Sequence, residues 1–180
     1  MAVEGKACIL EAPGEPAVVR DIIVESPGPN DVLIKLVASG VCHTDLTVKM
    51  QNGAGMDFPI VLGHEGAGIV EEVGSNVTNL KPGDPVCIAY RAPCDQCPAC
   101  LRGDPRHCYM ALRPEPRIKR KSDGATCSQV LRCGTFATHT VVNAKAAVKM
   151  PENMPLDKAC LIACGVVTGV GAAMNTSPVF

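Results

Sequence analysis

The chain has 180 residues, of which 47% are hydrophobic and 19% charged. That balance is typical of a folded globular domain and excludes an intrinsically disordered chain. A formal net charge of −1 provides no basic surface for nucleic acid or an acidic membrane. We find no apolar run near the ~18 residues of a membrane span and no apolar signal core, so we expect a cytoplasmic protein.

Short β-branched runs, separated by proline and glycine, dominate the chain as far as residue 150. This pattern is typical of strands joined by tight turns. Many short strands of this kind predict a barrel or a sandwich. The predicted strands cover residues 6–12, 18–25, 32–38, 60–62, 67–73, 86–90, 136–142 and 147–150.

The pattern changes after Pro151, where alanine, leucine and methionine become frequent. We predict helices over 155–163 and 166–174, with a break at Cys164 and the glycine after it. The sequence Gly-Val-Gly at 169–171 lies inside the second predicted helix. It lacks the third glycine and the later acidic residue of a dinucleotide-binding turn, so we expect no such site in this chain.

Cysteine is unusually frequent, with eleven residues, and the chain shows no secretory signal. An odd count in a reduced protein favours metal ligation over a disulfide framework. The spacing Cys94-x2-Cys97-x2-Cys100-x7-Cys108 can surround one zinc ion with sulfurs at about 2.3 Å, leaving no open position, as in a structural site. A ferredoxin cluster would instead have its fourth cysteine three residues on and before a proline, whereas Cys108 precedes Tyr109.

A basic stretch follows the four-cysteine segment. We interpret it as a solvated loop, in preference to a nucleic-acid-binding or targeting element. Its members are Arg113, Arg117, Lys119, Arg120 and Lys121.

Cys42, His64 and Cys164 form a second candidate set, although they lie far apart in the sequence. Each is ambiguous alone, because a lone cysteine is usually a small buried side chain and a lone histidine a hydrogen-bonded polar group. Together they could supply two thiolates and an imidazole, which leaves a fourth zinc position open for a substrate.

These motifs resemble those of zinc-dependent medium-chain alcohol dehydrogenases, especially the long-lobe alcohol and glutathione-dependent formaldehyde dehydrogenases. The resemblance rests on the four-cysteine segment and on three other motifs in the family's order. They are Gly-Val-Cys-His-Thr-Asp at 40–45, Gly-His-Glu-Gly-Ala-Gly at 63–68 and Cys-Gly-Val-Val-Thr-Gly-Val-Gly at 164–171.

The resemblance implies a mainly β fold with short helices, a GroES-like, partly open β-barrel with a zinc-binding lobe at 93–109. It assigns residues 1–165 to a GroES-like catalytic domain. Residues 166–180 would be the helical start of a connection to a cofactor-binding Rossmann half, which we expect to be absent from this chain.

The resemblance also implies roles for individual residues. The dispersed set matches the catalytic zinc ligands, and the four close cysteines match the structural ones. Thr47 stands where many members have a histidine that ends a proton relay, and Tyr90 falls where an aromatic residue lines the substrate pocket. Thr44 matches a hydroxyl that relays the alcohol proton, Asp45 and Glu65 match carboxylates that orient the metal ligands, and His43 and Thr168 match positions that contact the cofactor.

The resemblance implies an oxidoreductase that interconverts an alcohol and an aldehyde or ketone, with zinc as Lewis acid and hydride transfer to NAD(P). We expect two zinc ions per full-length chain, a small alcohol or aldehyde substrate, a homo-oligomer, and no nucleic-acid or membrane partner. The chain alone should fold but lack activity and NAD affinity, with an apolar face around Cys164. A non-catalytic zinc-binding interaction module and a polyol or other medium-chain dehydrogenase remain alternatives.

Overall fold

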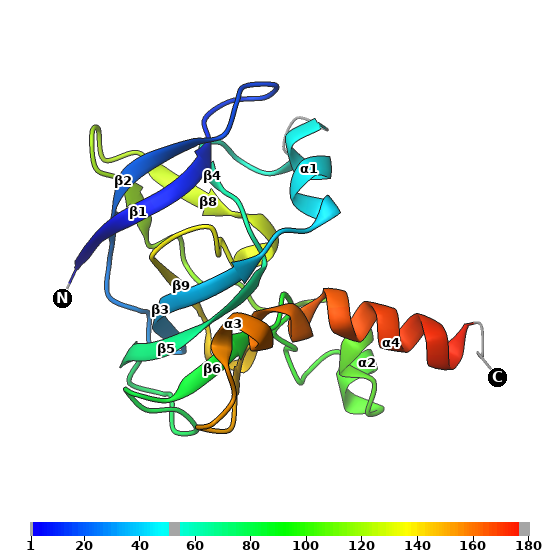
Figure 1. Ribbon diagram of the computed structural model, residues 1–180. Helices are drawn as coiled ribbons and strands as arrows, with labels where there is room; N and C mark the ends of the chain where they lie inside the picture. Colours follow the sequence, from blue (N-terminus) through cyan, green and yellow to red (C-terminus); the bar gives the residue numbers. More distant parts are fainter. Residues whose placement is uncertain (1, 51–54, 177–180) are drawn as a thin grey trace.

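Two β-sheets form the body of the computed structural model, which describes residues 2–50 and 55–176 (Figure 1). The first sheet closes into a five-stranded barrel in the order β1-β2-β7-β8-β4. Its strands pair antiparallel, except that β4 and β8 run parallel. The strands are β1 (Val3–Leu10), β2 (Val18–Val24), β7 (Ile118–Arg120), β8 (Thr126–Gln129) and β4 (Ile60–Val61).

The second sheet has five strands in the order β10-β6-β5-β3-β9, all paired antiparallel. Its long central pair, β3 and β5, places the ends of both strands beside the candidate metal ligands Cys42 and His64. The strands are β10 (Ala147–Lys149), β6 (Pro85–Ile88), β5 (Glu65–Val73), β3 (Asp31–Gly40) and β9 (His139–Asn143).

The predicted mainly β, GroES-like fold is confirmed, and each predicted strand region contains a strand. We expected a partly open barrel, whereas the first sheet closes on itself. The closure depends on β7 and β8, two short strands that the sequence analysis did not predict. Closing the ring removes free strand edges from this sheet.

The basic stretch after the four-cysteine segment is not all loop, so our interpretation is wrong for Ile118–Arg120, which form β7. Ile118 is fully buried in the barrel and anchors the strand. Lys119 Nζ lies 2.5 Å from Glu25 Oε1, and Arg120 pairs with Glu11. Because their charges are paired, two basic residues can follow a buried one in a short strand.

Aliphatic side chains fill the barrel, as the scarcity of aromatic residues requires. Ile9, Ile22, Val24, Val61 and Ile118 are fully buried in one cluster. Burying a side chain of this size contributes roughly 1.5–3 kcal/mol, so the cluster fixes the barrel on which the site is built.

The helices are short. The predicted helices over 155–163 and 166–174 are confirmed as α3 (Leu156–Ala159) with a 3-10 turn (Cys160–Ala163), followed after Cys164 by α4 (Gly165–Asn175). The sequence analysis did not predict α1 (His43–Met50), which follows β3, or the single turn α2 (Pro98–Leu101).

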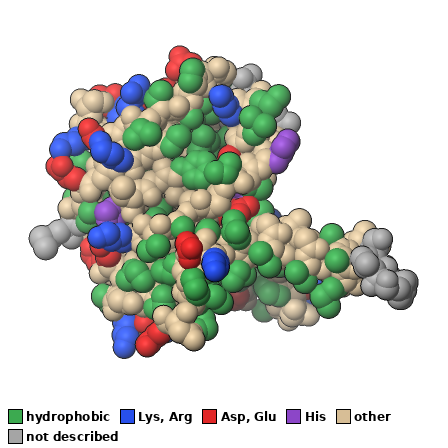
Figure 2. All heavy atoms as spheres, in the orientation of Figure 1, with side chains coloured by type: hydrophobic (Ala, Val, Ile, Leu, Met, Phe, Trp, Pro, Cys, Tyr) green, Lys and Arg blue, Asp and Glu red, His purple; other side chains and the backbone are tan. Residues whose placement is uncertain are grey.

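Helix α4 extends away from the two sheets (Figure 1), and none of its residues is buried. Val167 is 57% exposed and Met174 74% exposed, so the expected apolar face beside Cys164 is confirmed (Figure 2). Among the described residues, no single helix has the length and hydropathy to cross a membrane; only α3 with its 3-10 turn and α4, bent by 52°, pass that test jointly.

Candidate metal centres

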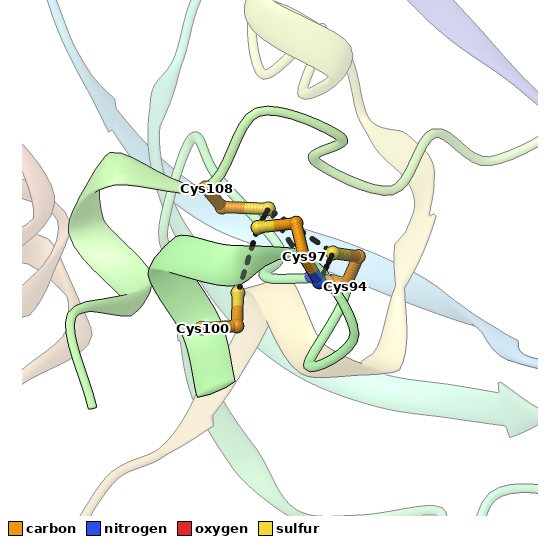
Figure 3. Close-up of side chains that lie close together, drawn as sticks. All are labelled: Cys94, Cys97, Cys100 and Cys108. Carbon is orange, nitrogen blue, oxygen red and sulfur yellow. Dashed lines mark hydrogen bonds between the residues drawn. The ribbon is translucent and has the colours of Figure 1, made fainter. Parts of the chain in front are cut away.

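Four sulfur atoms meet in the lobe between β6 and β7 (Figure 3). Cys97 Sγ lies 3.6 Å from Cys100 Sγ and 3.9 Å from Cys108 Sγ, and Cys108 Sγ lies 3.5 Å from Cys94 Sγ. Four sulfurs placed tetrahedrally around zinc at 2.3 Å are about 3.8 Å apart. The spacing of these thiols therefore fits one zinc ion.

The local backbone explains why the lobe adopts this geometry. Pro98 begins α2 directly after Cys97, and Asp95 has a left-handed φ of 59° that turns the chain between the first two cysteines. The Cys97 amide donates to Cys94 Sγ at 3.3 Å, and the Cys94 amide donates to Cys108 Sγ at 3.4 Å. Amide donors directed at sulfur stabilise thiolates, the form in which cysteine binds metal.

The pKa values of the lobe thiols also favour a bound cation. A hydrogen bond with the Cys100 backbone is the main cause that lowers the pKa of Cys97 to about 6. Burial and the neighbouring thiols raise the pKa of Cys100 to about 12. Cys97 therefore ionises readily while Cys100 resists ionisation, and a divalent cation among the thiols would allow all four to lose their protons.

The second cluster joins three distant segments of the chain. Cys42 follows β3, His64 precedes β5, and Cys164 lies between the 3-10 turn and α4. Cys42 Sγ and Cys164 Sγ are 3.9 Å apart, again close to the edge of a zinc tetrahedron. The ligand atoms of these three residues and of Glu65 all lie within 4.8 Å of one another, so the set fits a metal ion.

Backbone geometry brings His64 and Cys42 to this place. Gly63 has a φ of 90°, and a Cβ there would lie 2.5 Å from the backbone nitrogen of Phe136, so only glycine fits the turn before His64. Gly40 allows a similarly close approach, because its Cβ would lie 2.4 Å from Glu65 Oε2. Steric crowding therefore explains why each of the two motifs begins with glycine.

Asp45, on α1, organises the cluster. Its Oδ1 lies 3.3 Å from His64 Nδ1 and accepts a hydrogen bond from the Gly63 amide at 3.0 Å, while its Oδ2 accepts one from the Cys42 amide at 3.1 Å. Burial opposes its ionisation, but the hydrogen bond with His64 and the two amides lower the pKa of Asp45 overall. A hydrogen on His64 Nδ1 leaves Nε2 as the nitrogen available to a metal.

Glu65 and Thr44 complete the surroundings of the cluster. Glu65 is 3% exposed, and burial, together with its hydrogen bond to Cys164, raises the pKa of the Cys164 thiol to about 12. Thr44 Oγ1 lies 3.6 Å from Cys42 Sγ. The sequence analysis expected Glu65 to orient the metal ligands. In the structure, one of its carboxylate oxygens lies within 4.8 Å of the ligand atoms of Cys42, His64 and Cys164.

The residues expected to contact the cofactor or to line the substrate pocket are exposed. His43 is exposed, with its Nδ1 3.3 Å from Thr47 Oγ1. Thr168 is exposed on α4, where its amide donates to the Cys164 carbonyl at 2.9 Å. Tyr90, 43% exposed, lines a cavity of ≈ 480 Å³ formed by other segments than the second cluster. None of the three belongs to either group of candidate ligands in the described residues.

The barrel, the sulfur-lined lobe and the second cluster define a GroES-like domain of the alcohol dehydrogenase type. The chain belongs to the family described as the alcohol dehydrogenase GroES-like domain, whose sequence profile matches residues 28–152.

Known relatives share this assignment. The chain is 41% identical to alcohol dehydrogenase class-3 of Drosophila melanogaster over 97% of its own length and 48% of the relative's. It is 40% identical to S-(hydroxymethyl)glutathione dehydrogenase of Paracoccus denitrificans, with coverages of 96% and 48%. The chain thus spans about half the length of these curated relatives.

Solved structures show the same fold. An alcohol dehydrogenase zinc-binding domain protein from Burkholderia ambifaria superposes with a TM-score of 0.88 at 32% identity, covering 97% of this chain and 49% of that one. Benzyl alcohol dehydrogenase from Acinetobacter calcoaceticus gives a TM-score of 0.81 at 31% identity, covering 96% and 48%.

Proposed function

We propose that this chain is the catalytic half of a zinc-dependent alcohol dehydrogenase that transfers hydride to NAD(P). The convergence of Cys42, His64 and Cys164 around one point carries the proposal. Two thiolates and one imidazole are the protein ligands of catalytic zinc in alcohol dehydrogenases. The activity would require a full-length protein, about twice as long as this chain, and its substrate would be a small alcohol or aldehyde.

Zinc in the second cluster would supply Lewis-acid chemistry, which lowers the pKa of an alcohol hydroxyl. The chain's own residues would do the rest. Thr44 Oγ1, 3.6 Å from the Cys42 sulfur, is placed to accept the proton of the alcohol. Asp45 would hold His64 in the orientation and tautomer that a metal ligand needs. Glu65 would set the electrostatics beside Cys164.

We propose that the lobe holds a second, structural zinc ion, which gives two per full-length chain. Four thiols would occupy all its tetrahedral positions and leave none for a substrate. Binding would stabilise a segment that contains little regular structure, one helical turn and one 3-10 turn.

We propose that α4 does not hold a dinucleotide. Gly169 and Gly171 lie in α4, and a Cβ at either would meet nothing within 4 Å, so no ligand-sized cradle forms there. His43 and Thr168 would touch a cofactor that is held elsewhere. We therefore propose that this chain alone neither binds NAD(P) measurably nor turns over alcohol, because orientation of the reactants contributes roughly 7–11 kcal/mol of barrier lowering.

The second cluster also bears on the alternatives. A non-catalytic zinc module would need only the lobe, and polyol dehydrogenases usually replace the ligand at the position of Cys164. The names of the relatives suggest a simple alcohol or S-(hydroxymethyl)glutathione as substrate. A cytoplasmic homo-oligomer remains our expectation for the full-length protein.

The test joins this chain to the second half of the Drosophila relative and follows alcohol-dependent NADH formation. We expect turnover by the fusion, none by the chain alone, and none by a fusion carrying Cys42→Ser. Cobalt(II) substitution supplies a readout independent of activity, since thiolate–cobalt absorption should fall in Cys42→Ser. Equal turnover or equal cobalt spectra in the Cys42→Ser and unmodified fusions would contradict the proposed catalytic site.

A further inference from the structure

Three arginines from different segments line the ≈ 480 Å³ cavity that also contains Tyr90. Arg91 follows β6, Arg113 follows the lobe, and Arg132 ends the 3-10 turn Val130–Arg132 after β8. The only acidic residue in the described lining is Asp57, so the lining has a net formal charge of +2. The local positive charge contrasts with the formal net charge of −1 of the whole chain.

The three arginines are not neutralised by the described parts of the protein. Arg113 and Arg132 make no ion pair and no side-chain hydrogen bond with any described residue. Arg91 Nη1 donates to the Arg106 carbonyl at 2.7 Å, but its Nε is buried without a partner. By contrast, four other arginines pair with carboxylates, namely Arg20, Arg106, Arg117 and Arg120.

The backbone holds Arg132 in the cavity at an energetic cost. Leu131 and Arg132 have left-handed φ values of 48° and 67°. Left-handed backbone costs roughly 1–2 kcal/mol for each residue other than glycine. Burial, followed by the charges of Arg113 and Arg91, lowers the pKa of Arg132. Three like charges that line one cavity repel one another.

We infer that this cavity binds a dianionic oxyanion, namely inorganic phosphate or the phosphate end of an organic molecule, through Arg91, Arg113 and Arg132. Planar guanidinium groups bind phosphate oxygens by paired hydrogen bonds, and a dianion matches the net charge of the lining. A bound dianion would offset the repulsion between the three arginines that line the cavity.

Neither sulfur cluster contributes to this lining, so the inference does not depend on the proposed dehydrogenase activity. Calorimetric titration of the purified, zinc-loaded chain with inorganic phosphate at low ionic strength tests it. We expect a dissociation constant of about 1 mM or lower, weakening with added salt. Arg132→Gln should weaken binding by about tenfold or more, and Arg132→Lys should weaken it less. Arg20→Gln, which removes the same charge far from this lining, should leave binding unchanged.

The unfolding temperature is a second readout. A purely structural role of Arg132 predicts that Arg132→Gln lowers it, whereas a phosphate-binding role predicts no decrease. Without phosphate, Arg132→Gln should unfold at the same temperature as the unmodified chain or higher, because it removes repulsion. With phosphate, only the unmodified chain and the Arg20→Gln control should be strongly stabilised. Ethyl phosphate distinguishes the two sources: tighter binding of the ester points to an organic ligand, and tighter binding of inorganic phosphate points to the free ion.

The inference is overturned if the unmodified chain binds neither probe up to about 10 mM, an affinity too weak for a built site. Equal binding by Arg132→Gln and Arg20→Gln would overturn it as well. So would a lower unfolding temperature of Arg132→Gln without phosphate, combined with unchanged phosphate binding. A catalytically inactive fusion that still binds phosphate would separate this site from the proposed function.

Discussion

The two sulfur clusters differ in how the chain assembles them. The lobe takes its four ligands from one short segment, and Cys94 and Cys108 are 14 positions apart. The second cluster joins Cys42 to Cys164 across 122 positions and needs β3, β5 and the turn before α4 in place. A metal in the lobe therefore supports local structure, whereas the second site depends on the folded barrel for its geometry.

The largest expected effect comes from breaking the lobe. Cys97→Ser should remove one of two zinc ions and destabilise the chain by about 3 kcal/mol or more, since the lobe has no large aliphatic core of its own. For a chain of this size that corresponds to roughly 10 °C in Tm. Cys42→Ser should also remove one zinc ion, but with a much smaller change in Tm.

Zinc content by elemental analysis and Tm by calorimetry check both variants. Cys127→Ser is a matched control, because Cys127 is buried in the barrel and belongs to neither cluster. It should keep both zinc ions. Similar Tm values for Cys97→Ser and Cys42→Ser would contradict the contrast between the clusters.

The next effect concerns chemistry at the second cluster and is measured in the fusion that contains both halves. Thr44→Val should lose roughly 10²- to 10⁴-fold in kcat/KM, the range for a positioned proton-transfer group. Thr44→Ser keeps the hydroxyl and should remain active. Zinc content should be unchanged in both variants, and equal turnover by Thr44→Val and the unmodified fusion would remove Thr44 from the mechanism.

A smaller effect is expected when the metal ligand His64 is kept but its hydrogen bond to Asp45 is weakened. Asp45→Asn keeps the size of the side chain but loses the charge that faces His64 Nδ1. Zinc affinity of the second cluster should fall by about 10- to 100-fold, as for other groups that orient a metal ligand. Competition with a chelator measures this, and the lobe zinc of the same sample is the internal control.

The contrast between the clusters also explains what could be predicted from the sequence. The spacing of the four lobe cysteines implies one metal site without any knowledge of the fold. The second set was ambiguous by chemistry alone, and only the resemblance of its motifs singled out Cys42, His64 and Cys164. The roles of these residues remain predictions, but the structure brings their ligand atoms together.

Other features could not be predicted because they depend on tertiary contacts. β7 has only three residues, two of them basic, and becomes a strand because Glu25 and Glu11 pair with its charges. Helix α1 has only Asp45 and Val48 buried, too few apolar contacts to give a clear helical period. The arginine-lined cavity joins three segments that no local pattern connects.

The smallest expected effect separates metal binding from ion pairing within the lobe. Asp104 Oδ2 lies 2.6 Å from His107 Nδ1, and its Oδ1 lies 2.7 Å from Arg106 Nε. These contacts, first with His107 and then with Arg106, lower the pKa of Asp104. A carboxyl with a lowered pKa stabilises the fold above its ordinary pKa of about 3.9, and that contribution is lost as the pH falls through this region. Asp104→Asn should therefore lower Tm slightly at pH 7.

The difference in Tm between Asp104→Asn and the unmodified chain should shrink as the pH falls below about 4. Exposed ion pairs contribute little because solvent screens them, so the effect at pH 7 should stay far below that of Cys97→Ser. Zinc content measured at each pH shows whether the metal is still bound, and only samples that retain it are compared. If Asp104→Asn lowered Tm as much as Cys97→Ser while both zinc ions remained bound, ion pairs and not metal would hold the lobe together.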